Sequence, residues 1–183
     1  DNFCWPDPIQ SDKTPDGHYK LAQLVRANKA LYDYTVAFSV PCISGKDSMK
    51  NDSIFGDVKI SIPPTLLFSV LGKIDDVSKA VTMDVKAPGD IVYIVGETFF
   101  ELGGSEYYKL IGEELSGTSF IGKSVPKVSA DNALKIYKAV GNITSERLAR
   151  SIHTPVIGGL GIALAQSAFA GGFGLEIDLS RVP

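Results

Sequence analysis

The chain has 183 residues, of which 44% are hydrophobic and 21% charged, and its formal net charge is -3. This composition is typical of one globular domain or two small ones and excludes a disordered or fibrous chain. Because charges of both signs are interspersed, we expect neither nucleic acid nor a membrane surface as a partner. No apolar run approaches the roughly 20 residues of a membrane-spanning helix and no signal peptide opens the chain, so we expect a cytoplasmic protein.

Two cysteines occur, Cys4 and Cys42, without the paired spacing of a zinc or redox site. We interpret them as free thiols in a reducing compartment. The sequence begins at Asp1 rather than at a methionine, and residues 175–183 are typical of a strand entering a turn rather than of a finishing element. Both features lead us to expect a piece of a longer polypeptide.

The opening of the chain combines a loop, a helix and a strand. Prolines and a glycine crowd residues 1–17, which predicts an irregular loop. Apolar side chains at helical spacing over residues 18–34 predict a helix whose apolar face packs into the core. Residues 36–43 are rich in β-branched and aromatic side chains, which predicts a strand that runs into the polar loop at residues 44–48.

Two further strands are expected before the first domain ends. Apolar and polar residues alternate over residues 58–62, which predicts a half-buried strand. Prolines at positions 63 and 64 interrupt it, and residues 65–74 form a second, mostly apolar strand. The first part of the chain is therefore expected to be rich in sheet, with a domain boundary near Asp75.

Strands and helices alternate after this boundary. A turn at residues 87–90 precedes an apolar segment at residues 91–95, which predicts a strand. Helices are expected from about Tyr107 and over residues 131–140, 143–151 and 158–170, with a last strand from residue 175. This order predicts a layered α/β or α+β domain.

The loop at residues 44–48 is the strongest local signal for ligand binding. It places a glycine, a lysine and two serines after a strand, where such groups approach phosphate oxygens closely. The loop is not a P-loop, because Val40 stands where the first glycine is required and Asp47 follows the lysine in place of serine or threonine. By composition alone, a solvated polar turn remains the alternative.

A series of motifs follows in order along essentially the whole chain. The motifs are DNFCWP at 1–6, SGKDSMK at 44–50, IPPT at 62–65, PGD at 88–90, GGSEY at 103–107, GGL at 158–160 and AFAGG at 168–172. In these motifs and their order the chain resembles the phosphoribosylformylglycinamidine synthase family. The position of the motifs resembles the C-terminal, second pseudo-symmetric half of that family.

The resemblance implies a fold of the α+β or α/β class. Residues 1–75 would form the end of a sheet-rich domain like the N-domain of aminoimidazole ribonucleotide synthetase. Residues 76–183 would form most of the α/β C-domain of the same superfamily, truncated at its C-terminal end. The implied reaction belongs to purine biosynthesis: ATP, with Mg²⁺, activates the formamide oxygen of formylglycinamide ribonucleotide, and glutamine-derived ammonia displaces phosphate.

The resemblance also implies partners. These are the remaining domains of the synthase, a glutaminase domain or subunit, and small-molecule nucleotide substrates. Because strands of the first domain would come from preceding sequence, an exposed sheet edge is expected, through which the chain would self-associate. The chain alone is expected to have no ligase activity.

Four residues receive a role from the resemblance. Asp1, Gly45 and Lys46 are expected to bind the nucleotide, and Ser48 is expected to bind the substrate. Gly45 would allow close backbone approach to the ligand and would adopt a conformation that other residues disfavour. Lys46 either neutralises phosphate or is a solvated loop cation. No catalytic residue and no metal ligand is assigned.

Residues 151–159 depart from the family pattern. Related second halves often carry an aspartate on Mg²⁺ and a serine on the nucleotide here, and this chain has Thr154 and Val156 at those positions. His153 is expected to pack or cap rather than to catalyse. The departure supports a second hypothesis, in which this region is a structural or nucleotide-holding half without catalysis.

Three aspartates, Asp47, Asp52 and Asp57, lie close together in the sequence. Oxygen-rich loops bind hard cations, but this spacing lacks the remaining ligands and the glycine of an EF-hand loop. We therefore interpret the three aspartates as parts of a solvated loop.

Overall fold

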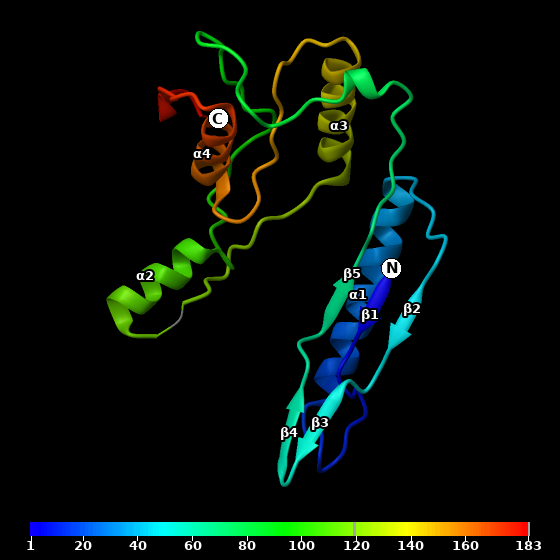
Figure 1. Cartoon of the computed structure of the whole chain (residues 1–183). Helices are drawn as coiled ribbons and strands as arrows, with labels where there is room; N and C mark the ends of the chain where they lie inside the picture. The colour runs from blue at the N-terminus through cyan, green and yellow to red at the C-terminus, as the bar shows by residue number, and fades with distance from the viewer. Residues whose placement is uncertain (119, 183) are drawn as a thin grey trace. The chain divides into compact units, whose positions relative to one another are not determined.

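The computed structural model describes residues 1–118 and 120–182, and the chain divides into two compact units, Asp1–Lys73 and Ile74–Pro183 (Figure 1). The division falls next to the boundary expected near Asp75. Assignment of the two units to two synthetase-type domains stays a prediction. None of the described helices is long and apolar enough to cross a membrane.

The N-terminal unit contains a three-stranded sheet and a hairpin. In the sheet, β1 (Asn2–Cys4) pairs parallel with β2 (Lys46–Ser48) and antiparallel with β5 (Thr65–Leu67). The hairpin joins β3 (Asp52–Phe55) to β4 (Val58–Ser61). Parallel strands require a crossover connection, and α1 (Gly17–Ala37) lies in the connection between β1 and β2. The strand predicted at residues 58–62 is confirmed as β4, whereas the one at 65–74 is confirmed only over β5.

The strand expected at residues 36–43 is wrong, because α1 continues into this segment. Ser39 has a φ of 54°, and its N–H donates to Val36 O over 3.1 Å. The N–H of Val40 donates to Thr35 O over 3.0 Å, which completes a common left-handed helix end. Of the β-branched residues that suggested a strand, Val36 lies in the last turn of α1, whereas Val40 and Ile43 follow the helix end, and pairing with β1 begins only at β2.

The buried core of this unit centres on Phe3 and Trp5, each 3% exposed, whose rings are 6.1 Å apart. Trp5 Nε1 donates to Lys20 O over 3.0 Å, which ties the loop after β1 to the first turn of α1. Gly17 packs against the same loop, because a Cβ atom there would overlap the backbone nitrogen of Gln10. A side chain at the start of α1 would therefore displace backbone.

Beyond its first turn, the apolar face of α1 is not packed into a core as predicted. Leu21, Val25 and Val36 are 44%, 61% and 60% exposed. A helix of 21 residues is about 32 Å long, whereas a strand of three residues is about 10 Å long. The short strands of this unit therefore leave most of the helix uncovered.

The C-terminal unit is built from helices. Its elements are η1 (Val77–Lys79), α2 (Glu106–Ser116), α3 (Ala130–Ser145), α4 (Gly159–Gly171) and η2 (Leu179–Arg181). The helices predicted from about Tyr107, over 131–140 and over 158–170 are confirmed. The helical stretch expected at 143–151 is wrong beyond Ser145, where α3 ends.

Short polar residues and glycine set the ends of α2 and α3. Ser105 Oγ accepts the N–H of Tyr108 over 3.2 Å, and Ser129 Oγ accepts the N–H of Asn132 over 3.4 Å. Each contact satisfies an amide that has no partner within the helix. Gly117, at φ 66°, then ends α2 in the left-handed conformation that glycine adopts most readily.

Neither strand expected in the C-terminal unit is formed. Residues 91–95 belong to no sheet among the described residues, and Ile91 and Tyr93 are largely exposed. Near the end of the chain, Asp178 Oδ1 accepts the N–H of Ser180 and begins η2 instead of a strand, and Pro183 lies outside the described residues. A strand forms only where a neighbour supplies hydrogen bonds. The chain is thus a mixed α/β protein whose described strands lie in the N-terminal unit.

We predict that Gly17→Ala lowers the free energy of unfolding of the N-terminal unit by about 1–3 kcal/mol, because the new methyl group would overlap backbone. Urea unfolding followed by fluorescence of Trp5, the single tryptophan, measures this unit. Gly72→Ala is the matched control, since a Cβ atom there meets nothing within 4 Å. Equal unfolding midpoints for the two variants would contradict the packing argument.

Candidate functional site

The parallel pairing of β1 with β2 brings the four predicted site residues together. The amino group of Asp1 donates to Ser44 O over 2.9 Å, and the N–H of Lys46 donates to Asp1 O over 3.1 Å. Cys4 is the register partner of Ser48. Residues at opposite ends of a long connection therefore form one continuous patch at the edge of the sheet.

A glycine fits position 45 because the Asp1 side chain lies against it, and not because the backbone there has a conformation that only glycine adopts. A Cβ atom at position 45 would lie 2.7 Å from Asp1 Oδ1. Gly45 is not among the residues with a positive φ, so the expected disfavoured conformation is wrong. Because the Asp1 carboxylate is the end of a flexible side chain, a larger residue at position 45 would displace it and leave the strand pair in place.

The two faces of the strand pair differ in character. Successive side chains of a strand point to opposite faces, so Lys46 and Ser48 share one face and Asp47 lies on the other. Phe3, the register partner of Asp47, is buried. Lys46 is exposed and forms no ion pair within the described part of the chain, so its ammonium group is available to an anion.

Asn51 holds Ser48 in place and was missed by the sequence analysis. Its Nδ2 donates to Ser48 O over 2.7 Å, and its Oδ1 accepts from Ser48 Oγ over 3.3 Å. The N–H of Asn51 also donates to Trp5 O over 3.0 Å, while the N–H of Trp5 donates to Ser48 O over 2.8 Å. The spacing Ser-x-x-Asn is the only sequence signal for this arrangement. Since the Ser48 hydroxyl donates to Asn51, its lone pairs remain to accept from a ligand.

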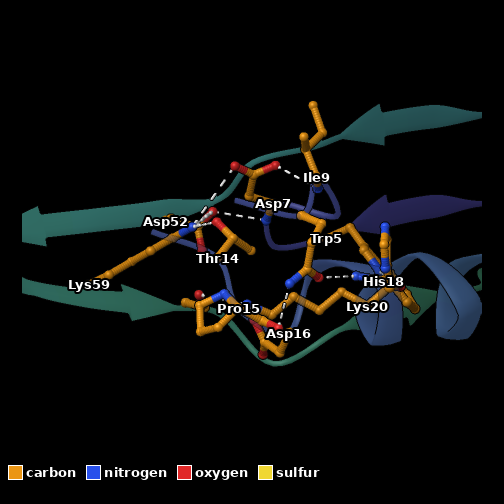
Figure 2. A network of polar contacts seen from close by, with 12 residues as sticks. Trp5, Asp7, Ile9, Thr14, Pro15, Asp16, His18, Lys20, Asp52 and Lys59 are labelled. Carbon is orange, nitrogen blue, oxygen red and sulfur yellow. Dashed lines mark hydrogen bonds and ion pairs between the residues drawn. The ribbon is translucent and has the colours of Figure 1, made fainter. Parts of the chain in front are cut away.

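A network of charged side chains joins the loop after β1 to the β3–β4 hairpin (Figure 2). The side chain of Asp52 is 8% exposed, and its Oδ2 accepts the N–H of Asp7 over 2.9 Å. Lys59 Nζ lies 3.7 Å from Asp52 Oδ2 and 3.9 Å from Asp7 Oδ2, and it donates to Thr14 Oγ1 over 2.6 Å. The solvated-loop interpretation is therefore wrong for Asp52, which is a buried member of an ion-pair network.

The surroundings of Asp52 lower the pKa of its carboxyl group. Burial, the largest influence, would raise the pKa, but polar contacts and two ammonium groups outweigh it. The contacts come from the Ser61 hydroxyl and the Asp7 N–H, and the charges from Lys59 and Lys20. The Ser61 hydroxyl faces the carboxylate without a hydrogen bond of ordinary geometry, since Oδ1 has no such partner. Asp52 is therefore ionised at neutral pH.

Residues 151–159, which depart from the family pattern, lie in the C-terminal unit, and α4 begins at the end of this segment. His153 Nε2 is 2.9 Å from Gln166 Oε1 of that helix, so the histidine has a partner in α4. Thr154 and Val156 are exposed. Gly158 begins α4 at φ 90° without a side-chain cap. Among the described residues, no group of three or more His, Cys, Asp or Glu side chains is arranged to hold a metal ion.

Comparison with known proteins identifies a family that covers the C-terminal part of this chain. The family model described as AIR synthase related protein, C-terminal domain, matches residues 87–183. The chain belongs to the AIR synthase related protein family. The match covers α2, α3 and α4 together with the segment around Thr154.

Longer relatives match the N-terminal unit as well. The phosphoribosylformylglycinamidine synthase subunit PurL of Methanocaldococcus jannaschii is 35% identical, over 99% of this chain and 23% of the relative. The subunit PurL of Thermobifida fusca is 34% identical, over 91% of the chain and 20% of the relative. The subunit PurL of Thermus thermophilus is 31% identical, over 93% of the chain and 22% of the relative. These relatives confirm the resemblance inferred from the motifs, and the chain spans about a fifth of their length.

We predict that Asp52→Asn lowers the free energy of unfolding of the N-terminal unit at pH 7 by about 1–3 kcal/mol, because a buried charge partner is lost. Since the folded pKa of Asp52 is lowered, its charge stabilises the fold fully above the unfolded value of about 3.9. That contribution disappears as pH falls through the folded pKa. The wild type should therefore lose more stability on acidification than the variant.

Urea unfolding followed by Trp5 fluorescence at several pH values between about 7 and 3 measures this difference. Asp57→Asn is the control, because Asp57 lies in the turn of the hairpin to which Asp52 belongs and is exposed. It should keep the acid dependence of the wild type. An Asp52→Asn variant with an unchanged acid dependence would show that folding does not lower the pKa of Asp52.

Proposed function

We propose that this chain is part of a phosphoribosylformylglycinamidine synthase, from the second pseudo-symmetric half of the enzyme. In that reaction ATP activates the formamide oxygen of formylglycinamide ribonucleotide, and ammonia from glutamine displaces phosphate. The observation that carries the proposal is similarity to subunits PurL over nearly the whole chain, in both units. Residues 1–75 would be the end of the sheet-rich domain and residues 76–183 most of the α/β domain.

The patch on β1 and β2 is the proposed ligand site. Asp1, Gly45 and Lys46 would bind the nucleotide, and Ser48 would bind the substrate. Three features support this proposal: the exposed ammonium group of Lys46, the space that Gly45 leaves for the Asp1 carboxylate, and the lone pairs of the Ser48 hydroxyl, which donates its proton to Asn51. A lysine ammonium group is a suitable partner for phosphate oxygens. Phosphoryl transfer needs such positioning and charge neutralisation more than it needs a protein nucleophile.

The residues that the structure describes do not fit a protein-held Mg²⁺ site. Mg²⁺ usually takes one or two carboxylates together with substrate phosphates. Position 154 carries a threonine, and Asp52 is engaged by Lys59 and by the N–H of Asp7. We therefore assign no step of the reaction to a metal held by this chain. A Mg²⁺ ion that arrives with ATP would rely on phosphate oxygens and on ligands from elsewhere in the synthase.

A structural or nucleotide-holding half without catalysis is the second candidate function. It is favoured by the neutral residues at Thr154 and Val156, which offer no charged ligand. Under this proposal the patch would hold a nucleotide that is not turned over, or would only pack. The two candidates differ in whether changes at Gly45 and Lys46 alter nucleotide binding and turnover in the complete enzyme.

The proposed partners are the remaining domains of the synthase and a glutaminase domain or subunit, in the cytoplasm. The uncovered apolar side chains of α1 support a protein partner for the N-terminal unit, because exposed apolar surface of this kind is characteristic of interfaces. The outer edges of β2 and β5 are available for pairing in the described unit. Self-association through such an edge is therefore part of the proposal.

We predict that Lys46→Met weakens nucleotide binding by the complete enzyme by about 10- to 100-fold, the value of one charged hydrogen bond. Gly45→Val should weaken binding similarly, because the new side chain displaces the Asp1 carboxylate. Calorimetric titration with ATP and Mg²⁺ measures both. Lys13→Met, an exposed lysine of the same unit, is the control. Unchanged affinity in both site variants, with wild-type binding confirmed, would remove the patch from the nucleotide site.

We predict that residues 1–183 alone form no amidine product from formylglycinamide ribonucleotide, ATP, Mg²⁺ and ammonia. The reason is that the chain supplies about a fifth of the length of its relatives, and one patch cannot enclose two substrates. Product formation is measured by mass spectrometry, with the complete enzyme as the positive control. Turnover by the purified chain would overturn the proposal that other domains complete the site.

A further inference from the structure

A second cluster of charged residues lies in the C-terminal unit and includes none of the residues of the proposed ligand site. Two segments that are distant in the sequence, residues 78–86 and 147–150, enclose an open cavity of about 260 Å³. Its lining includes two hydroxyl groups and four cations: Ser78, Thr82, Lys79, Lys86, Arg147 and Arg150. No carboxylate is part of the lining.

The two walls of the cavity are joined by specific contacts. Arg147 Nη2 donates to Ser78 Oγ over 2.6 Å, although 69 positions separate the two residues. The N–H of Ile152 donates to Thr82 O over 3.1 Å. These contacts connect the segment after α3 to the segment around η1. The cavity is therefore a defined feature of this unit and not the accidental approach of two loops.

The cations of the cavity are only partly neutralised. Lys86 Nζ lies 2.6 Å from Asp84 Oδ1, and Arg150 Nη1 lies 3.0 Å from Asp90 Oδ1. Neither Lys79 nor Arg147 forms an ion pair in the described part of the chain. The cavity thus has two cations without a matching carboxylate, which favours a ligand of about two negative charges.

The exposed Asp76 is the further carboxylate near this wall. Its pKa is lowered first by the side chain and backbone of Ser78, and to a smaller extent by the charge of Lys79. Its Oδ1 accepts the N–H of Ser78 and so begins η1. Asp76 is therefore occupied as a cap and is not part of the cavity lining.

The backbone at Arg147 provides an independent observation. Arg147 has a φ of 55°, and its N–H donates to Thr144 O while the N–H of Leu148 donates to Ile143 O. These bonds form the helix end at which glycine is the usual residue, because other residues are strained there. An arginine at this position keeps the strain and gains a side chain that reaches the cavity.

We propose that this cavity binds the phosphate group of a small phosphate monoester. Arg147 and Lys79 would contact the phosphate oxygens. The Thr82 hydroxyl already donates to Asp84, and Ser78 Oγ accepts from Arg147 Nη2, so these two groups hold the cavity wall rather than the ligand. A guanidinium fork and an ammonium group suit a phosphate dianion. The cavity exceeds the volume of a phosphate group, so it has room for a small organic part. This inference is independent of the proposed ligase function, since it uses none of the residues on β1 and β2.

Binding is tested on the full chain by calorimetric titration with glycerol 3-phosphate at low ionic strength, with glycerol and inorganic phosphate as comparison ligands. Saturable binding of glycerol 3-phosphate, with weaker binding of inorganic phosphate and none of glycerol, is expected. NMR amide shifts should change around Ser78 and Arg147. Absence of saturable binding, or binding only of a polyanion such as heparin, would overturn the proposal.

Arg147→Gly separates binding from folding. Glycine relieves the strained φ, which offsets the lost hydrogen bond to Ser78, so the melting temperature should change little, while affinity for glycerol 3-phosphate should drop at least tenfold. Lys79→Met should also weaken binding at least tenfold and serves as the second variant. Lys138→Met, an exposed lysine of α3, is the matched control and should bind like the wild type. Wild-type affinity in Arg147→Gly and Lys79→Met, or an equal loss in Lys138→Met, would overturn the site.

Discussion

The N-terminal unit depends on the parallel pairing of β1 with β2. Three residue pairs, from Asn2 with Lys46 to Cys4 with Ser48, join segments that a loop and a 21-residue helix separate. The pairing alone would be weak, because a short parallel ladder offers few hydrogen bonds. The indole of Trp5 stabilises the pairing by donating a hydrogen bond to Lys20 O in the first turn of α1. Asn51 Nδ2 donates to Ser48 O at the C-terminal end of β2. The geometry of the patch follows from these contacts.

The charged network around Asp52 performs a related task for the hairpin and the loop. Removing one member of a buried ion pair costs more than the pair contributes, because the remaining charge is left without a partner. Lys59 interacts with Asp7, Asp52 and Thr14 together, so three segments of the chain share one ammonium group. Such a network favours a unique arrangement of loop and hairpin, which is what a ligand site on the neighbouring strands requires.

Local pattern predicted the helices well and the strands poorly. Apolar spacing located α2, α3 and α4, because a helix satisfies its own backbone. Residues 36–43 and 91–95 have the composition of strands, but pairing depends on a distant partner that composition does not reveal. The four predicted site residues came from family resemblance, and their adjacency became visible only through the register of β1 and β2. Asn51 and the contact between Asp7 and Asp52 were missed for the same reason: each joins segments far apart in the sequence.

The crossover between β1 and β2 also orders the events of folding. The β3–β4 hairpin closes over a two-residue turn, and hairpins form within about 1–10 μs. The parallel pair must bring residue 3 to residue 47. Closing this loop costs more conformational entropy than closing the hairpin, and the cost precedes the contacts that offset it. During synthesis, β1 therefore has no parallel partner until β2 has left the ribosome. The patch on these strands can therefore be completed only after residues 46–48 have been synthesised.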